Sequence, residues 1–307
     1  MTKTKKISDR LIQILGEDEV KMNADMAEYT SFKAGGCADI LASPGDARKL
    51  RDVLRFLSEE NYPHTVIGNG SNTLVRDGGY RGVIVRIGSA FDYIKNDGSR
   101  LICGAGTRMS AVARAALAQS LAGFEFASGI PGSIGGAVFM NAGAYGGEMA
   151  DILEKVHVVS RDGGREYELT AGELDMGYRH TLLHETGDIV TEAVLSLRPG
   201  EYDDIRREIT DLTSRRNAKQ PVNYPSAGSF FKRPEGYFAG ALIQEAGLKG
   251  LTVGGAQVSE LHAGFIINKD NATASDILRL MEIVQAGVMD TAGVKLEPEV
   301  RIIGENL

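Results

Sequence analysis

Glycine pairs that follow short apolar segments are the residues of this chain whose spacing most suggests chemistry. Gly68-Asn-Gly-Ser-Asn72 follows one such segment, Gly104-Ala-Gly106 follows another, and a glycine-rich stretch runs from Gly129 to Gly147. Glycine lets the backbone approach a ligand closely, and successive backbone N–H groups can form a nest for a phosphate. A single Gly-x-Gly is more often a tight turn. Three such clusters together favour a phosphorylated ligand over turns alone.

Composition narrows the class of protein that could carry this site. The chain has 307 residues with 38 glycines, and its 34 basic and 41 acidic residues give a net charge of −7. A net negative charge disfavours nucleic acid as a partner. The two cysteines, Cys37 and Cys103, are far apart and indicate neither a disulfide framework nor a metal site. No segment is apolar enough to span a membrane or to serve as a signal peptide, so we expect a cytoplasmic protein without membrane insertion.

Several common catalytic motifs are absent from the sequence. It contains no Gly-x-Gly-x-x-Gly, no Gly-x4-Gly-Lys-Ser/Thr, no His-Glu-x-x-His and no Gly-x-Ser-x-Gly. A standard dinucleotide-binding or P-loop site, a zinc protease and an α/β hydrolase are therefore disfavoured. The five histidines are scattered, and no metal is expected.

Hydrophobic periodicity predicts a mixed chain of helices and strands, and hence an α+β protein. The expected helices lie at 7–15, across Leu50–Leu57, from Thr107 to Gly123, and at 201–216, 237–246 and 275–288. Ser8 is expected to cap the first helix and Thr107 the third. The last helix is expected to begin with a capping box at Thr273-x-x-Asp276. The expected strands lie at 38–42, 65–67, 82–87, 101–103, 155–160, 166–169, 189–197, 251–258, 264–268 and 294–303. The composition changes at Pro199-Gly200, which predicts an N-terminal segment at 1–31 and domains at 32–198 and 199–307.

The order of the motifs carries a resemblance to a known family. Gly68–Val75, Asp77–Val83 and Ser128–Ala137 resemble the flavin-binding half of the UDP-N-acetylenolpyruvoylglucosamine reductases. The similarity continues through Asn141–Gly146, Gly177–Arg179, Ala227–Lys232, Gly255–Val258, His262–Asn268 and Leu296–Val300. It extends from about Tyr29 to Gly304 and matches the compact type, which lacks an extra tyrosine-bearing loop.

The resemblance implies a fold and a cofactor. It predicts an FAD-binding domain of the vanillyl-alcohol-oxidase (PCMH) type, made of two small α/β lobes, followed by an α+β substrate-binding domain. Relatives with covalent flavin carry a histidine near Ser71 or Asn72, so the FAD should be bound non-covalently here. The residues expected at the cofactor are Gly68, Asn69, Gly70, Ser71, Asn72, Gly132, Ser133, Gly135, Gly136 and Asn141.

The resemblance also implies a reaction. It predicts the NADPH-dependent reduction of UDP-N-acetylglucosamine enolpyruvate to UDP-N-acetylmuramate, a step of peptidoglycan precursor synthesis, by a monomer. Arg179 and Glu299 would supply electrostatic and proton-network support, and Ser229 would protonate the substrate carbon. The residues expected to contact the substrate are Lys232, Gln257 and Asn268.

Without the family, these polar residues have plainer interpretations. Ser229 would be a turn serine, although the adjacent Phe230-Phe231 pair could exclude water and hold its hydroxyl rigidly. Arg179 would be a surface charge, and Glu299 would share a strand face with Glu297. A protein of net negative charge that binds UDP also needs a local cationic patch. The cations available for it are Arg215, Arg216, Lys219, Lys232 and Arg233.

Two other classes of function remain open from the sequence. One is a sugar or lactone oxidase of the same fold, which would react with oxygen and have little use for Ser229, Arg179 and Glu299 together. The other is a non-catalytic module that binds a nucleotide sugar and no flavin. Purified protein that stays colourless after FAD is added would exclude both the reductase and the oxidase.

Overall fold

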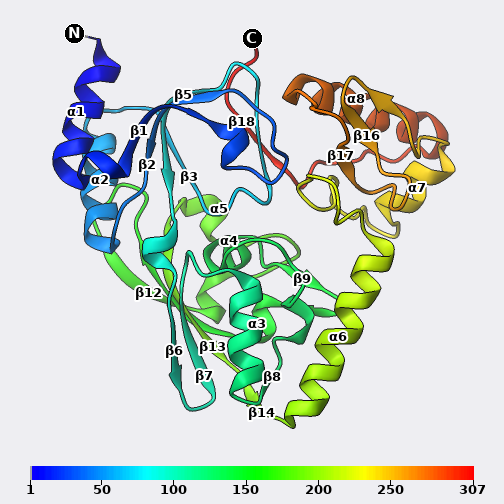
Figure 1. Ribbon diagram of the computed structural model, residues 1–307, viewed down its shortest axis with the longest axis horizontal. Helices are drawn as coiled ribbons and strands as arrows, with labels where there is room; N and C mark the ends of the chain where they lie inside the picture. The colour runs from blue at the N-terminus through cyan, green and yellow to red at the C-terminus, as the bar shows by residue number, and fades with distance from the viewer. Residues whose placement is uncertain (1) are drawn as a thin grey trace. The chain divides into compact units, whose positions relative to one another are not determined.

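The computed structural model describes residues 2–307 (Figure 1). These residues form two compact units. Unit 1 comprises the residues up to Met22 together with Ile40–Asn69 and Gly82–Arg216. Unit 2 comprises Asn23–Asp39, Gly70–Arg81 and Asn217–Leu307. No helix within 2–307 has the length and hydropathy of a membrane span.

The helices and strands are labelled here as in Figure 1. The α-helices are α1 Lys3–Leu15, α2 Ala47–Glu59, α3 Met109–Ala118, α4 Ile134–Phe139, α5 Leu183–Thr186, α6 Tyr202–Lys219, α7 Ala239–Glu245 and α8 Ala274–Ala292. The short 3-10 helices are η1 Glu17–Glu19, η2 Met26–Glu28, η3 Ser89–Phe91, η4 Glu125–Ala127, η5 Met149–Asp151 and η6 Ala171–Leu174. The strands up to residue 104 are β1 Val20–Asp25, β2 Cys37–Ala42, β3 His64–Ile67, β4 Thr73–Val75, β5 Tyr80–Arg86, β6 Ile94–Asp97 and β7 Arg100–Gly104. The later strands are β8 Leu121–Ala122, β9 Gly143–Ala144, β10 Gly147–Glu148, β11 Leu153–Val159, β12 Glu166–Thr170, β13 Ile189–Ser196, β14 Arg198–Pro199, β15 Thr252–Val253, β16 Ala256–Val258, β17 Ile266–Asn268 and β18 Arg301–Ile303.

A five-stranded antiparallel sheet of order β12-β11-β13-β7-β6 forms the centre of unit 1. Helices α3 and α4 pack against its strands β7 and β13. The short strands β8 and β14 pair with each other and tie the end of α3 to the start of α6 (Figure 1). This arrangement places the glycine-rich segment around α4 against the sheet.

A four-stranded sheet of order β1-β2-β5-β3 begins in the N-terminal part of the chain. Its strands β3 and β5 run parallel, as expected for strands joined by a crossover. Helix α2 buries the apolar face predicted from its periodicity, including Leu50 and Leu57. Asp46 caps its N-terminus with a side chain that accepts a hydrogen bond from the Lys49 amide at 2.7 Å.

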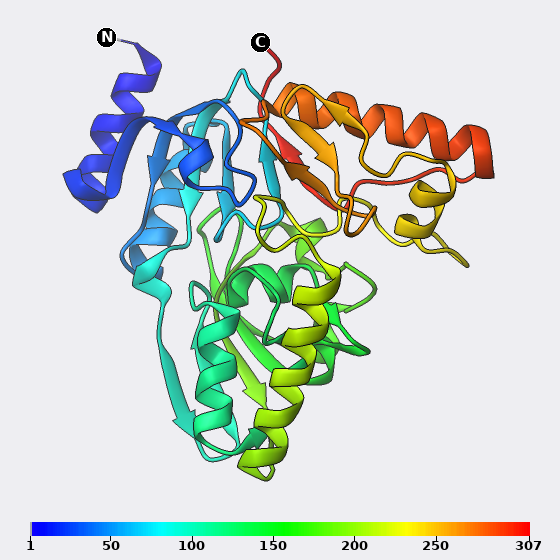
Figure 2. The same ribbon diagram turned by 45° about the vertical axis from the view of Figure 1, so that its right-hand side comes forward.

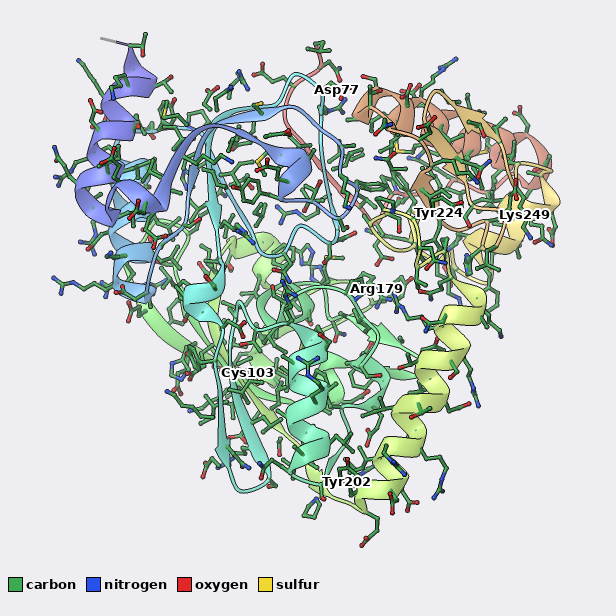
Figure 3. All side chains as sticks on the ribbon, viewed as in Figure 1. Asp77, Cys103, Arg179, Tyr202, Tyr224 and Lys249 are labelled. Carbon is green, nitrogen blue, oxygen red and sulfur yellow. The ribbon has the colours of Figure 1, made fainter. Side chains whose placement is uncertain are left out.

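Unit 2 is built on the three-stranded antiparallel sheet β15-β16-β17, with α8 packed along it (Figure 2). Helix α8 begins with the predicted capping box, in which Thr273 and Asp276 bond to each other's backbone amides. Asp77, labelled in Figure 3, also accepts bonds from the backbone amides of Ala274 and Ser275, at 2.8 and 2.7 Å. These contacts connect the segment around Asp77 to the C-terminal sheet and helix.

Several boundaries predicted from the sequence are wrong. Thr2, not Ser8, caps α1. Thr107 does not cap α3, because its hydroxyl bonds to the backbone of Tyr93, and α3 ends at Ala118 rather than at Gly123. Only the last three residues of the strand expected at 294–303 form a strand. For Thr107 the cause is a competing tertiary contact, because its hydroxyl bonds to the backbone of Tyr93 instead of capping the helix.

The two units also differ from the predicted domain boundaries. Most of α6, which was expected to open the second domain, clusters with unit 1, and segments 23–39 and 70–81 fold with the C-terminal residues. Segment 23–39 folds with the C-terminal residues because its Phe32 is fully buried, with its ring 6.1 Å from that of Phe230. The side chain of Asn268 also donates a hydrogen bond to the Phe32 carbonyl at 2.9 Å.

Ser8 offers a stability prediction because its hydroxyl is buried in α1 without a hydrogen-bond partner among residues 2–307. Ser8→Ala removes an unsatisfied polar atom and improves helix propensity, so it should raise the free energy of unfolding by about 1 kcal/mol. Ser58→Ala in α2, where the serine is only half-buried, isolates the propensity contribution. Thermal melts of both variants test this, and a Ser8→Ala protein less stable than wild type would contradict it.

Candidate flavin and substrate site

Two of the glycine clusters meet in unit 1. A Cβ atom added to Gly68 would lie 2.7 Å from the hydroxyl oxygen of Ser133, so the loop after β3 and the loop before α4 are close enough that a side chain at position 68 would force this hydroxyl to move. The contact is made by the first glycine of one predicted cofactor loop and the serine of the other. The structure therefore brings together loops that are 65 positions apart in the sequence (68 to 133).

The middle cluster, Gly104-Ala-Gly106, has a supporting role. Cβ atoms at Gly104 and Gly106 would collide with backbone oxygens at 2.1 Å, so these glycines pack against the chain itself. Ala105 between them accepts a hydrogen bond from the Gly135 amide at 2.8 Å, and the Thr107 carbonyl accepts one from Ile134 at 2.9 Å. This cluster holds the loop before α4 in shape.

The Ser133 hydroxyl is the clearest sign of a ligand in this region. Ser133 is 2% exposed, and among residues 2–307 its Oγ has no hydrogen-bond partner. Leaving a buried hydroxyl unsatisfied is costly, and an acceptor such as a phosphate oxygen would satisfy it. Gly136, three positions later, is exposed, and outside its own helix backbone the nearest atom to the place of its Cβ is the Ser133 hydroxyl oxygen at 3.9 Å. The loop before α4, with its buried Ser133 hydroxyl and its open position at Gly136, fits the pyrophosphate of a flavin dinucleotide.

Valine substitutions separate ligand approach from internal packing in this loop. At Gly135 a Cβ would lie 2.9 Å from the Ala105 methyl, so Gly135→Val would disturb the fold itself. At Gly136 the nearest atom is 3.9 Å away, so Gly136→Val should fold and yet lose at least about 10-fold in FAD affinity, because the branched side chain fills space a ligand would use. Gly172→Val, at another open position, is the control. Equal FAD content in all folded variants would show that this loop does not hold the cofactor.

The remainder of the first loop belongs to unit 2. A Cβ at Gly70 would lie 2.1 Å from the Tyr29 carbonyl oxygen, and the Ser31 amide donates to the Gly70 carbonyl at 3.1 Å. Asn72 donates from its side chain to the Glu299 carbonyl at 3.1 Å and accepts at its own carbonyl from the Arg301 amide at 3.0 Å. A predicted flavin-loop residue is thus bonded to the segment that carries Glu299.

Ser229 and Glu299 lie on neighbouring segments of unit 2. The Glu299 amide donates to the Phe230 carbonyl at 2.8 Å, and the Lys232 amide donates to the Glu297 carbonyl at 2.8 Å. Glu299 is half-buried, whereas Ser229 is exposed. These backbone bonds join the segment that carries the predicted proton donor to the segment that carries the predicted acidic residue.

The expected shielding of Ser229 by the aromatic pair is wrong. Phe230 is fully buried and Phe231 is 3% exposed, and both pack into the core of unit 2. Their rings therefore pack into the core of unit 2 and do not shield Ser229, which is exposed.

Arg179 occupies a tight turn in unit 1 between η6 and α5 (Figure 3). Its guanidinium donates to the carbonyls of Gly143 at 3.0 Å and Asn141 at 3.4 Å and lies 5.1 Å from the Tyr178 ring. Arg179 is half-buried and has a backbone φ of +54°. This is a fixed arginine rather than the solvated surface charge of the plainer interpretation.

Three other predicted site residues direct their side chains into the protein. Asn141 is fully buried, donates to the Gly177 carbonyl at 3.0 Å and accepts from the Ala150 amide at 2.9 Å. Asn268 accepts from the Ala272 amide at 2.8 Å in addition to its bond to Phe32, and Gln257 donates to the Gly250 carbonyl at 3.3 Å. Their side-chain amides therefore form hydrogen bonds with the backbone near the candidate site.

The candidate cations differ sharply in their surroundings. Arg216 lies against the glycine-rich loop, since a Cβ on Gly129 would be 2.8 Å from its Cδ, and burial lowers the pKa of its guanidinium below the ordinary value. Arg215, next to it, is exposed and paired with Asp211 at 2.8 Å. Lys232 is 44% exposed in its side chain and lies 3.9 Å from Glu297. Sequence reasoning included Arg216 only as one cation among several, because helical phase alone did not show which arginine faces the loop.

Comparisons with known proteins match both parts of the chain. Residues 38–167 match a family model described as an FAD binding domain. Residues 220–303 match a model described as the C-terminal domain of UDP-N-acetylenolpyruvoylglucosamine reductase.

Whole-length relatives agree with these models. A UDP-N-acetylenolpyruvoylglucosamine reductase of Geobacillus thermodenitrificans is 48% identical over 99% of this chain and 100% of its own, and one of Alkaliphilus oremlandii is 47% identical over 96% and 97%. The crystal structure of the enzyme from Thermus caldophilus is 36% identical, with a TM-score of 0.79 over 92% of this chain and 98% of that one. The chain therefore belongs to the UDP-N-acetylenolpyruvoylglucosamine reductase family and is an FAD-dependent oxidoreductase with the predicted α+β fold.

Proposed function

We propose that this chain uses NADPH to reduce UDP-N-acetylglucosamine enolpyruvate to UDP-N-acetylmuramate in peptidoglycan precursor synthesis, with Arg179, Ser229 and Glu299 as its catalytic residues. The observation that supports this most is in unit 2. There Ser229 and Glu299 lie on hydrogen-bonded segments, and Asn72 of the flavin loop is bonded to the Glu299 backbone. A proton donor, an acidic group and a cofactor loop are therefore connected.

The reaction needs a hydride and a proton. FAD held by the glycine loops would supply hydride chemistry, with NADPH as the source of the hydride and the vinyl carbon of the enolpyruvyl group as its acceptor. The adjacent carbon then carries enolate character next to a carboxylate, and this charge requires a cation or hydrogen-bond donors. We assign the cationic support to the Arg179 guanidinium and the proton to the Ser229 hydroxyl. Addition of one hydride and one proton completes the reduction of the double bond.

Glu299 has a different task from the other two residues. A carboxylate next to a developing enolate would oppose it, so Glu299 helps only when it is protonated or hydrogen-bonded. Its half-buried position is consistent with such a network. We therefore assign to Glu299 the support of proton delivery rather than the stabilisation of negative charge.

Cofactor and substrate contacts follow from the same geometry. The Ser133 hydroxyl and the backbone of Gly68, Gly132, Gly135 and Gly136 would hold the flavin pyrophosphate, with Asn69, Gly70, Ser71 and Asn72 completing the loop. The FAD would stay non-covalent, because Ser71 and Asn72 are not suited to a flavin linkage. Lys232 would bind the substrate, and Arg216 is a half-buried cation available to an anionic group beside the glycine-rich loop. Within their own units, Asn141, Gln257 and Asn268 would hold the backbone near the proposed contacts through their side-chain hydrogen bonds.

The finer organisation is also part of the proposal. Residues 32–198 would form the FAD-binding domain, residues 199–307 the substrate-binding domain, and residues 1–31 a leading segment, with individual strands and helices shared between the compact units as described above. The protein would work as a monomer in the cytoplasm, without nucleic acid or membrane insertion.

Anaerobic half-reactions test the function directly. NADPH should bleach the bound flavin, and the enolpyruvyl sugar should then restore its absorbance without oxygen. Restoration by oxygen alone, and not by the sugar, would favour the sugar or lactone oxidase. Protein that takes up no FAD would leave only the nucleotide-sugar-binding module.

A further inference from the structure

We propose that Thr181 and Asn141 are positioning residues for Arg179, whose proposed catalytic role this inference extends. Neither residue would touch the substrate. Their side-chain hydrogen bonds would hold the turn that carries Arg179, and with it the direction of the guanidinium.

The turn itself is an unfavourable place for an arginine. Gly177 and His180 exchange two backbone hydrogen bonds, of 3.0 and 3.2 Å, so Tyr178 and Arg179 occupy the two corners. At φ +54° Arg179 is in the left-handed region, which glycine and asparagine tolerate and longer side chains avoid. A residue stays in such a conformation only where its surroundings determine it.

Two buried side chains provide that constraint, one on each side of the turn. Before the turn, Asn141 Nδ2 donates to the Gly177 carbonyl at 3.0 Å. After it, Thr181 Oγ1 donates to the Phe139 carbonyl at 2.9 Å. Asn141 and Thr181 are both 0% exposed, so their bonds are protected from exchange with water. Both bonds join the turn to the same segment, residues 139–141 at the end of α4.

The guanidinium is oriented by the continuation of that segment. It donates to the Asn141 and Gly143 carbonyls, at 3.4 and 3.0 Å. The backbone of the turn and the guanidinium of Arg179 are thus both hydrogen-bonded to one segment, residues 139–143. Asn141 Oδ1 also accepts from the Ala150 amide at 2.9 Å, which fixes this element from its far side. Loss of the side-chain hydrogen bond of either Asn141 or Thr181 would keep the positive charge of Arg179 but make the position of its guanidinium less defined.

This arrangement separates positioning from charge and from binding. Thr181 is fully buried and carries no charge, so a substitution there can affect the reaction only through the backbone it holds. Thr191 in β13 is a matched control, because its Oγ1 donates to the His157 carbonyl at 3.2 Å and it is 7% exposed. Both hydroxyls hold backbone in unit 1, and only that of Thr181 lies next to Arg179.

The experiment compares Thr181→Val, Thr181→Ser and Thr191→Val by melting temperature and by both half-reactions. Thr181→Val should slow reoxidation by the enolpyruvyl sugar about 10-fold without changing flavin reduction by NADPH. Thr181→Ser, which keeps the hydroxyl, should recover most of that rate. Thr191→Val should lower the melting temperature as much as Thr181→Val and leave both rates at the wild-type level. Wild-type reoxidation by Thr181→Val, or equal slowing by Thr191→Val, would overturn the proposal.

A double-mutant cycle distinguishes this inference from the role of Arg179 itself. In an Arg179→Ala background, Thr181→Val should cause no further slowing, whereas losses that multiply would contradict positioning. A wild-type rate for Arg179→Ala would refute the catalytic role and the positioning together. A slow Arg179→Ala with a wild-type Thr181→Val would refute positioning alone. If Thr181→Val does not fold, Asn141→Gly replaces it, because glycine suits the Asn141 φ of +40° and deletes both side-chain bonds.

Discussion

Ser229→Ala should slow reoxidation of the enzyme by the enolpyruvyl sugar by at least ~10² and leave flavin reduction by NADPH nearly unchanged. A serine hydroxyl is a weak acid, so it donates only to a strongly basic centre. The carbon next to the substrate carboxylate becomes such a centre after hydride addition, and a positioned proton donor contributes ~10²–10⁴-fold. Reduction by NADPH involves no proton from this residue.

Ser226 is the matched control for that prediction. Its contact with Ser31 uses its backbone carbonyl, which accepts the Ser31 hydroxyl at 2.6 Å, so Ser226→Ala preserves the bond. Stopped-flow traces of each half-reaction should therefore show little change in this variant. Equal losses in both half-reactions of Ser229→Ala would indicate a displaced flavin, and a normal reoxidation rate would remove Ser229 from the mechanism.

Arg179→Lys should lose about 10²-fold in the same sugar-dependent half-reaction, although the charge is retained. The planar guanidinium reaches the carbonyls of Asn141 and Gly143 at once, whereas a lysine ammonium is a single point charge on a flexible stem. Lysine would also have to adopt the same left-handed backbone without the bonds that hold the head group in place.

Arg165→Lys is the control for the arginine experiment. The Arg165 guanidinium lies 5.2 Å from the Tyr167 ring, much as that of Arg179 lies by Tyr178, and this pair is outside the proposed site. Its replacement should leave both half-reactions unchanged. If Arg179→Lys also turned over at nearly the wild-type rate, Arg179 would act only as a long-range charge.

Local patterns were sufficient for the elements whose interactions are close in sequence. The apolar stripe of α2 and the capping box of α8 are set by residues three to four positions apart, and both predictions are confirmed. The order of the glycine and polar motifs was sufficient for the family, because the motifs extend along almost the whole chain. The α+β class, the FAD cofactor and the family were therefore accessible from the sequence.

Tertiary contacts decided what the motifs do. The sequence presents three similar glycine clusters. Only the folded chain shows that Gly104-Ala-Gly106 supports the loop before α4, and that this loop holds the buried Ser133 hydroxyl, which has no hydrogen-bond partner among residues 2–307. Likewise, only the folded chain shows that Phe230 packs in a core with Phe32, nearly 200 positions away (230 − 32 = 198), while Ser229 is exposed.

The sequence by itself determined the family, the FAD cofactor and the reaction class, and it named the candidate cofactor loops and catalytic residues, since all of these depend on residue type and order. Only the tertiary structure decided that segments 23–39 and 70–81 fold with the C-terminal residues and that Arg216 faces the glycine-rich loop. It also decided that Asn141 and Thr181 fasten the turn of Arg179. The physical reason is that each of these depends on hydrogen bonds or packing between residues tens to hundreds of positions apart, which periodicity and spacing do not encode.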